Sequence, residues 1–132
     1  VDLSAGTTGT FKPPQGLFTF QGKQAATATA NTIADPGNAG AIAVTASGVC
    51  ALTSAGAETR TLAIPTFMGQ EISLIADTYV GDIVVTSAQA INQAGNTILT
   101  FGVVNDNITL KAMTIGGALR WRVIASDGVA LS

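Results

Sequence analysis

The sequence predicts an all-β fold, either a small antiparallel β-sandwich or a β-barrel of the β-tulip type, preceded by an extended N-terminal arm. Three observations predict this: short stretches of alternating apolar and polar residues, turn residues between them, and a regular strand spacing in the second half of the chain. The chain has 132 residues, including 22 Ala, 18 Thr and 15 Gly, a length that suits one domain. We therefore expect an arm over residues 1–24 and a single β domain over residues 25–132.

The first 24 residues differ in composition from the rest of the chain. Val1–Gly16 is rich in Gly, Thr, Ser and Ala and contains two adjacent prolines, which is typical of extended backbone. This segment also carries more large apolar side chains than a solvated tail normally exposes. It is therefore either a first strand on its own core or an arm that docks on another subunit. The residues predicted to bind there are Phe11, Pro13, Pro14, Leu17, Phe18 and Phe20.

Two strands and a turn are expected over residues 28–45. Ala and Thr alternate with Ile and Val in residues 28–33 and 41–45, and the turn cluster Asp35-Pro36-Gly37-Asn38 lies between them. Because Ala favours helix, a helix over residues 24–34 is the competing interpretation. The interleaved Thr and Ile favour strands, since branched side chains lose freedom in a helix and pack well on a sheet.

The second half of the chain is more regular. Strands repeated every 8 to 12 residues, with turns between them, are typical of sandwiches and barrels. Turn signals occur at residues 68–70, 80–81, 105–107 and 116–117. The six expected strands begin near Arg60, Glu71, Asp82, Thr97, Ile108 and Leu119, at spacings of eleven, eleven, fifteen, eleven and eleven residues.

Alternation within these strands predicts which face is buried. The apolar residues of one parity form the predicted core, and the polar residues of the other parity point outward, as in an antiparallel sheet with one solvated side. The outward residues are Thr61, Ser73, Thr109, Lys111, Arg120 and Arg122. The predicted core consists of Leu62, Ile64, Ile72, Leu74, Ile83, Val85, Ile98, Ile108, Leu110, Leu119, Trp121 and Val123.

The composition argues against catalysis. Histidine is absent, which excludes triads and zinc sites that need it. Cys50, the one cysteine, cannot form an internal disulfide and lies among apolar residues, so we expect a buried, inert thiol. Phosphate-loop, zinc and hydrolase-elbow motifs are missing. Most of the eight carboxylates fall in turns, where they cap backbone groups, and Asn105-Asp106-Asn107 reads as a tight hairpin turn rather than a calcium loop. We therefore predict no enzyme, metal or cofactor.

The charge pattern also limits the partners. The isoelectric point is 4.7 and the six basic residues are scattered, so nucleic acid is not expected. No apolar run reaches the roughly 18 residues of a membrane span. We also expect no small-molecule substrate.

Trp121 lies between two arginines and could form a platform for a planar ligand. On a strand, however, it points away from both, which favours a core tryptophan with Arg120 and Arg122 at an edge or subunit interface.

One stretch carries a resemblance to a known group of proteins. Between Thr59 and Asp127, the segments TLAIP (61–65), GQEISLI (69–75) and LRWRVI (119–124) resemble small β domains of tailed-bacteriophage virion proteins, which often end in a tryptophan-containing strand. Within that group, a short, Ala/Thr/Gly-rich chain with a Pro/Gly-rich arm is similar to capsid decoration, or cement, proteins. The resemblance implies a homotrimer, made in the host cytoplasm, on the outer capsid surface of the virion. Its arm would reach the major capsid protein or a neighbouring subunit, and the protein would bridge adjacent capsomers.

Two other classes stay open at this stage. A receptor- or carbohydrate-binding module of a phage fibre or head fibre would show exposed aromatic residues in a groove, for which Trp121 and Tyr79 are the candidates. An enzyme subdomain, such as a lyase or glycosidase fragment, would show two carboxylates in one cleft with separated pKa values.

Overall fold

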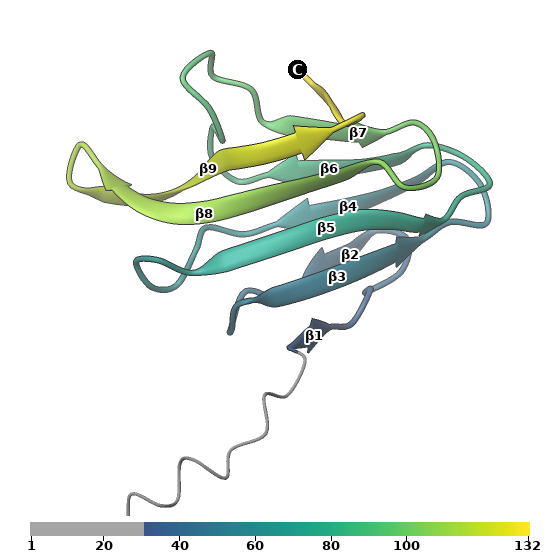
Figure 1. Cartoon of the computed structure of the whole chain (residues 1–132), viewed down its shortest axis with the longest axis horizontal. Coiled ribbons are helices and arrows are strands. Elements are labelled where there is room, and N and C mark those ends of the chain that lie inside the picture. Colours follow the sequence, from purple (N-terminus) through teal and green to yellow (C-terminus); the bar gives the residue numbers. More distant parts are fainter. Residues whose placement is uncertain (1–30) are drawn as a thin grey trace, which may run out of the picture. The chain divides into compact units, whose positions relative to one another are not determined.

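A computed structural model describes residues 31–132, which form two packed five-stranded sheets and no helix (Figure 1). The expected all-β sandwich is confirmed, whereas the arm over residues 1–24 lies outside the described residues. Within residues 31–132 no helix is long and apolar enough to cross a membrane. The strands are β1 (Thr32–Ile33), β2 (Gly40–Ile42), β3 (Gly48–Thr53), β4 (Glu58–Leu62), β5 (Glu71–Thr78), β6 (Ile83–Ser87), β7 (Ile98–Phe101), β8 (Asn107–Ile115), β9 (Ala118–Asp127) and β10 (Ala130–Leu131).

The two sheets are mixed rather than purely antiparallel. The first has the order β1-β3-β5-β8-β9 and the second β10-β7-β6-β4-β2. From β1 to β6 the chain changes sheet after every strand, so β1, β3 and β5 run parallel, as do β2, β4 and β6. Antiparallel pairing begins where β8 joins β5 and β7 joins β6. Alternating side chains identify a strand with one buried face but do not report the direction of its partner, which is why the sequence suggested antiparallel sheets.

Most of the predicted core is confirmed. Leu119 and Val123 are partly buried and pack against it. The indole N–H of Trp121 donates to the carbonyl of Ala63 at 2.8 Å, which satisfies its polar atom and ties β9 to the end of β4. The fully confirmed positions are Leu62, Ile72, Leu74, Ile83, Val85, Ile108, Leu110 and Trp121.

Two predicted core positions are wrong. Ile64 lies beyond the end of β4 and is 47% exposed. On β7 the buried residues are Leu99 and Phe101, so Ile98 has the outward parity. The register explains this, because Leu99 pairs with the buried Val85 of β6, and cross-strand partners share a face. Since Ile98 and Leu99 are both apolar, alternation alone could not choose between them.

Strands β3 and β10 were not predicted. In β3 the inward residues Cys50 and Leu52 are fully buried, while the outward Val49 and Ala51 are also apolar, so the sequence shows no clean alternation. Strand β10 has only two residues and pairs with β7 through Leu131 and Leu99. Both strands therefore depend on tertiary pairing rather than on a sequence pattern.

The register of β7 can be tested by comparing two neighbouring substitutions. Leu99→Ala should lower the free energy of unfolding by about 2 to 5 kcal/mol, because it leaves a cavity between the sheets. Ile98→Ala should cost clearly less, since its side chain is partly solvated. Urea denaturation of both variants measures the difference, and a larger loss for Ile98→Ala would show that the opposite face of β7 is buried.

Candidate functional site

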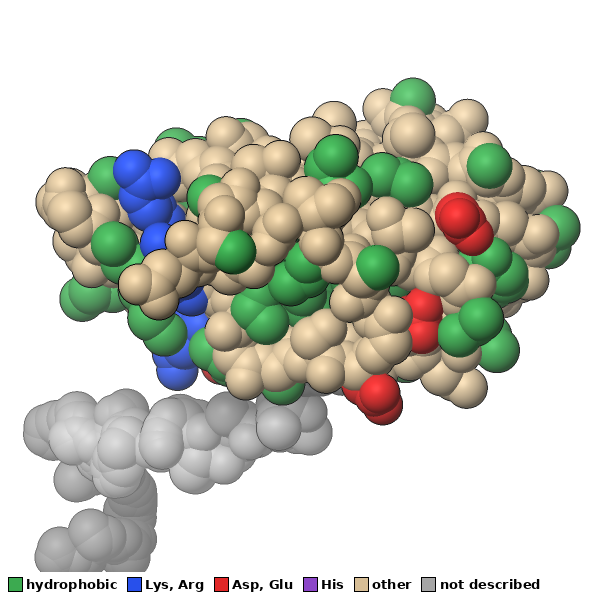
Figure 2. All heavy atoms as spheres, turned by 90° about the horizontal axis from the view of Figure 1, so that it is seen from above, with side chains coloured by type: hydrophobic (Ala, Val, Ile, Leu, Met, Phe, Trp, Pro, Cys, Tyr) green, Lys and Arg blue, Asp and Glu red, His purple; other side chains and the backbone are tan. Residues whose placement is uncertain are grey.

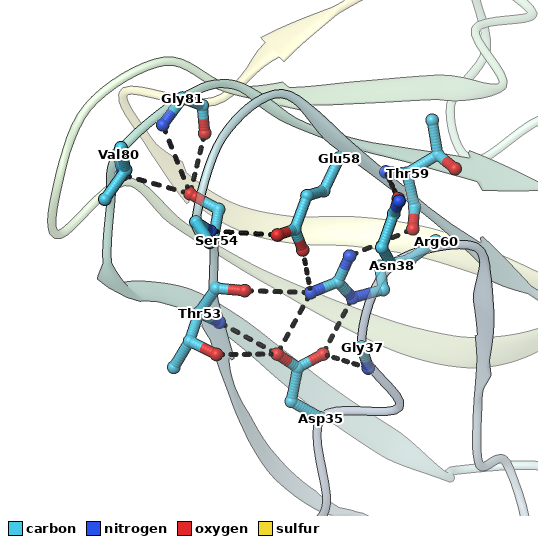
Figure 3. Close-up of polar contacts among 11 residues, drawn as sticks. Asp35, Gly37, Asn38, Thr53, Ser54, Glu58, Thr59, Arg60, Val80 and Gly81 are labelled. Atoms are coloured by element: carbon cyan, nitrogen blue, oxygen red, sulfur yellow. Dashed lines mark hydrogen bonds and ion pairs between the residues drawn. The ribbon is translucent and has the colours of Figure 1, made fainter.

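The densest polar cluster in the described residues lies where three connections meet at one end of the sandwich. Because β1, β3 and β5 are parallel, the connections that follow them leave at the same end. The Arg60 cluster consists of Arg60 at its centre with Asp35, Thr53 and Glu58 around it (Figure 3). Asp35 comes from the β1–β2 turn, Thr53 ends β3, and the other two residues belong to β4.

Arg60 is fully buried because it shares the inward parity of Leu62 on β4. Its Nε donates to Asp35 Oδ1 at 2.7 Å and its Nη2 to Asp35 Oδ2 at 3.1 Å, a bidentate pair. Nη2 also donates to the carbonyl of Thr53 at 2.9 Å and lies 3.0 Å from Glu58 Oε1. Nη1 donates to the carbonyl of Thr59 at 3.0 Å. Arg60 therefore joins the β1–β2 turn to the ends of β3 and β4.

The same contacts keep both carboxyl groups ionised. Partial burial opposes ionisation of Asp35, but hydrogen bonds from Arg60 and from the backbone N–H groups of Thr53 and Gly37 outweigh it and lower its pKa to about 2. A hydrogen bond from the N–H of Ala55, with Arg60 nearby, lowers the pKa of Glu58. The two carboxylates in turn raise the pKa of Arg60. A general acid needs a raised carboxyl pKa, whereas the pKa values of both carboxyl groups here are lowered. The cluster is therefore arranged as a structural clamp.

A hydroxyl forms a second clamp beside the Arg60 cluster. Ser54 Oγ accepts the N–H groups of Val80 at 3.1 Å and Gly81 at 3.3 Å and donates to the carbonyl of Gly81 at 2.8 Å. A Cβ on Gly81 would lie only 2.6 Å from the backbone carbon of Gly56, so the β3–β4 and β5–β6 connections pack directly on each other. These bonds use the hydroxyl as a donor and an acceptor within the fold.

Other carboxylates also serve turns, as the sequence predicted. Asp106 accepts the N–H groups of Gly102 at 2.7 Å and Val103 at 3.0 Å. Its turn links β7 in one sheet to β8 in the other rather than closing the predicted hairpin. The hydroxyl of Tyr79 donates to Asp82 at 2.6 Å, and this bond raises the pKa of Tyr79. Over residues 31–132 no three His, Cys, Asp or Glu side chains form a group that could hold a metal ion.

The prediction for Cys50 is confirmed. Its side chain is fully buried between the sheets. Burial, together with the negative charge of Asp35, raises the pKa of the thiol to about 11. The group therefore remains protonated near neutral pH, whereas a reactive cysteine needs a thiolate.

Trp121 and its two flanking arginines lie on opposite faces of β9. Trp121 is fully buried, so the predicted core tryptophan is confirmed. Arg122 Nη1 donates to the carbonyls of Ala90 at 2.9 Å and Trp121 at 3.0 Å. Arg120 and Arg122 are half-buried on the outer side, where they pair in register with Met113 and Lys111 of β8. Their predicted role at a subunit interface stays a prediction.

The structure also shows surface features that the sequence did not predict. The basic end of the sandwich carries Lys111, Arg120 and Arg122, and the acidic end carries the exposed Asp77, Asp82 and Asp127. Figure 2 shows this separation along the long axis, with Lys and Arg toward the left and Asp and Glu toward the right. Large apolar side chains are exposed at both ends: Ile64, Phe67, Met68, Met113 and Ile115 at the basic end, and Val80, Val103 and Val104 at the acidic end.

The predicted binding residues of the arm, Phe11, Pro13, Pro14, Leu17, Phe18 and Phe20, lie outside the described residues. Within the described residues, one sequence signal could have revealed the Arg60 cluster. Arg60 stands two residues before the core residue Leu62 and therefore shares its inward parity. The apolar ends had no such signal, since they join loops that are distant in sequence. No protein-family model matches this chain, and no curated protein matches it either.

The Arg60 cluster predicts acid sensitivity. An ordinary Asp has a pKa near 3.9 in the unfolded chain, whereas that of folded Asp35 is about 2. Its ionisation therefore stabilises the fold above about pH 4, and this contribution is lost as the pH falls toward 2. With allowance for solvent screening, the contribution is about 1 to 2 kcal/mol.

Urea unfolding of the wild type and Asp35→Asn across this pH range measures that contribution. The gap in stability should be largest near pH 6 and shrink below about pH 4, where the wild-type carboxyl becomes protonated. Asp77→Asn, at an exposed carboxyl of the same end, is the matched control and should show a much smaller gap. A gap between wild type and Asp35→Asn that stays constant with pH would contradict the ion pair as the source of stability.

Proposed function

We propose that this chain is a non-enzymatic structural protein of a tailed-phage virion, which binds the outer capsid surface and stabilises it by bridging adjacent capsomers. The proposal starts from the resemblance of residues 59–127 to such virion domains. The structural observation that supports it best is the exposure of large apolar side chains at both ends of the sandwich. Its partners are then the major capsid protein and further copies of the chain, in a homotrimer.

Three of these apolar side chains are more than half exposed. Met68 is 70% exposed, Val80 67% and Val103 58%, and they lie in connections rather than on a sheet face. Contiguous exposed apolar groups commonly mark surfaces that bind another protein. A bridging protein needs separate contact surfaces on a rigid body, and the two ends of one packed sandwich can supply them toward the capsid protein or toward further copies of the chain. Repetition over a capsid then turns weak contacts into strong attachment.

The chemistry of the described residues supports a role without catalysis. Asp35 and Glu58 have lowered pKa values and share one buried guanidinium. The hydroxyl of Ser54 and the carboxylate of Asp106 are used in loop clamps. The side chains that commonly act as acids, bases or nucleophiles are thus part of the scaffold at these positions. The surface and the N-terminal arm are left to make the functional contacts.

The fibre-module alternative receives no support from its two candidate aromatic residues. Trp121 is fully buried and bonded to Ala63, so its ring offers no face to a sugar. Tyr79 is partly buried, and its hydroxyl is bonded to Asp82. A stacking platform needs an open ring face. We therefore retain the capsid-binding role.

An add-back experiment tests the proposal. Phage particles that lack the gene should bind the purified full-length chain, sediment with it at a fixed copy number and release their DNA at a higher temperature. Deletion of residues 1–16 should weaken binding by at least about tenfold, equivalent to about 1.4 kcal/mol, because the predicted arm contact is lost.

Two results would count against this role. Failure of the full-length chain to sediment with particles would contradict capsid binding itself. Unchanged affinity after deletion of residues 1–16, with circular dichroism showing an intact β domain, would contradict only the role of the arm.

A further inference from the structure

The charges of the described domain are separated along its length. Four of the charged residues lie at the basic end, namely Glu71, Lys111, Arg120 and Arg122, and Lys111 Nζ lies 3.7 Å from Glu71 Oε2. The remaining seven lie at the acidic end, and the one cation among them, Arg60, is buried and paired. The exposed carboxylates of that end are Asp77, Asp82 and Asp127, of which Asp82 accepts a hydrogen bond from the hydroxyl of Tyr79.

Each charged end also carries several exposed apolar side chains. At the basic end, the N–H of Gly69 donates to the carbonyl of Ala112 at 2.9 Å, and Thr114 Oγ1 donates to Met68 Sδ at 3.6 Å. These contacts hold the β4–β5 connection, with Phe67 and Met68, against the β8–β9 hairpin with Met113 and Ile115.

At the acidic end, the N–H of Asn105 donates to the carbonyl of Ala76 at 2.8 Å. This bond fixes the connection that carries the exposed Val103 and Val104 beside the end of β5. Val80 projects from the β5–β6 connection, which the hydroxyl of Ser54 holds in place. Both apolar surfaces are therefore built on hydrogen-bonded loops.

We infer that the basic end of one copy binds the acidic end of a second copy, head to tail. The occupant follows from charge complementarity, because two basic ends or two acidic ends would place like charges together, whereas opposite ends attract. The apolar groups of both ends would be buried in the same contact. Such a contact is heterologous: it closes into a ring when the rotation between copies allows it, and otherwise extends as a filament. The inference does not depend on capsid binding.

Sedimentation velocity of the full-length chain tests the inference. The wild type should associate at concentrations up to about 100 μM, and association should weaken severalfold when salt is raised from low to high concentration, because screening weakens the charge attraction. A basic-end variant, Met68→Asp with Arg120→Glu, and an acidic-end variant, Val80→Lys with Asp77→Lys, should each associate at least about tenfold more weakly. Ile124→Asp, at an exposed apolar residue of β9 outside both ends, should associate like the wild type.

Mixing the two end variants distinguishes head-to-tail binding from other arrangements. Each variant retains one intact end, so the equimolar mixture should form a heterodimer that neither variant forms alone. Persistent association of the acidic-end variant by itself would point to basic-end pairing and overturn the inference. A wild type that stays monomeric at both salt concentrations would also overturn the inference. So would association that neither variant weakens, because other residues would then be responsible for it. Because self-association is measured without particles, its failure would leave the proposed capsid binding unaffected.

Discussion

Each of the first five connections carries the chain from one sheet to the other, and the remaining features depend on this crossing. Because alternate strands join the same sheet in the same direction, β1, β3 and β5 start at one end and finish at the other. Their three outgoing connections must then pack side by side, without the tight hairpins that antiparallel neighbours would use. The acidic end is built from these connections, while the basic end receives the returning chain and the β8–β9 hairpin.

The Arg60 cluster shows how the fold meets the cost of such packing. A buried guanidinium is expensive to desolvate unless charges and hydrogen bonds compensate it. Here Asp35 and Glu58 supply the negative charges, and the carbonyls of Thr53 and Thr59 accept further hydrogen bonds from the guanidinium. Because the partners come from the β1–β2 turn and from the ends of β3 and β4, these bonds also specify which connections lie together. The clamp leaves the outer loop surfaces free to carry apolar side chains.

The sequence predicted the strands better than their arrangement. All six expected strand starts in the second half lie within two residues of the observed ones, because alternating side chains report one buried face. That signal fails where both faces are apolar, as in β3, and where adjacent apolar residues compete, as at Ile98 and Leu99. Parallel pairing, the Arg60 cluster and the charged ends join residues distant in sequence, so local pattern could not place them together.

The central claim is tested most directly by a map, at a resolution that traces strands, of the phage particle to which the proposed role assigns this chain. The proposed role predicts this two-sheet domain on the outer capsid surface, at positions that join neighbouring capsomers. Adjacent copies should place Phe67 and Met68 of one against Val80 and Val103 of the next. Capsids without this domain, or domains located only on the tail or fibres, would contradict capsid decoration. Domains on the capsid that never touch each other through these ends would contradict the head-to-tail contact.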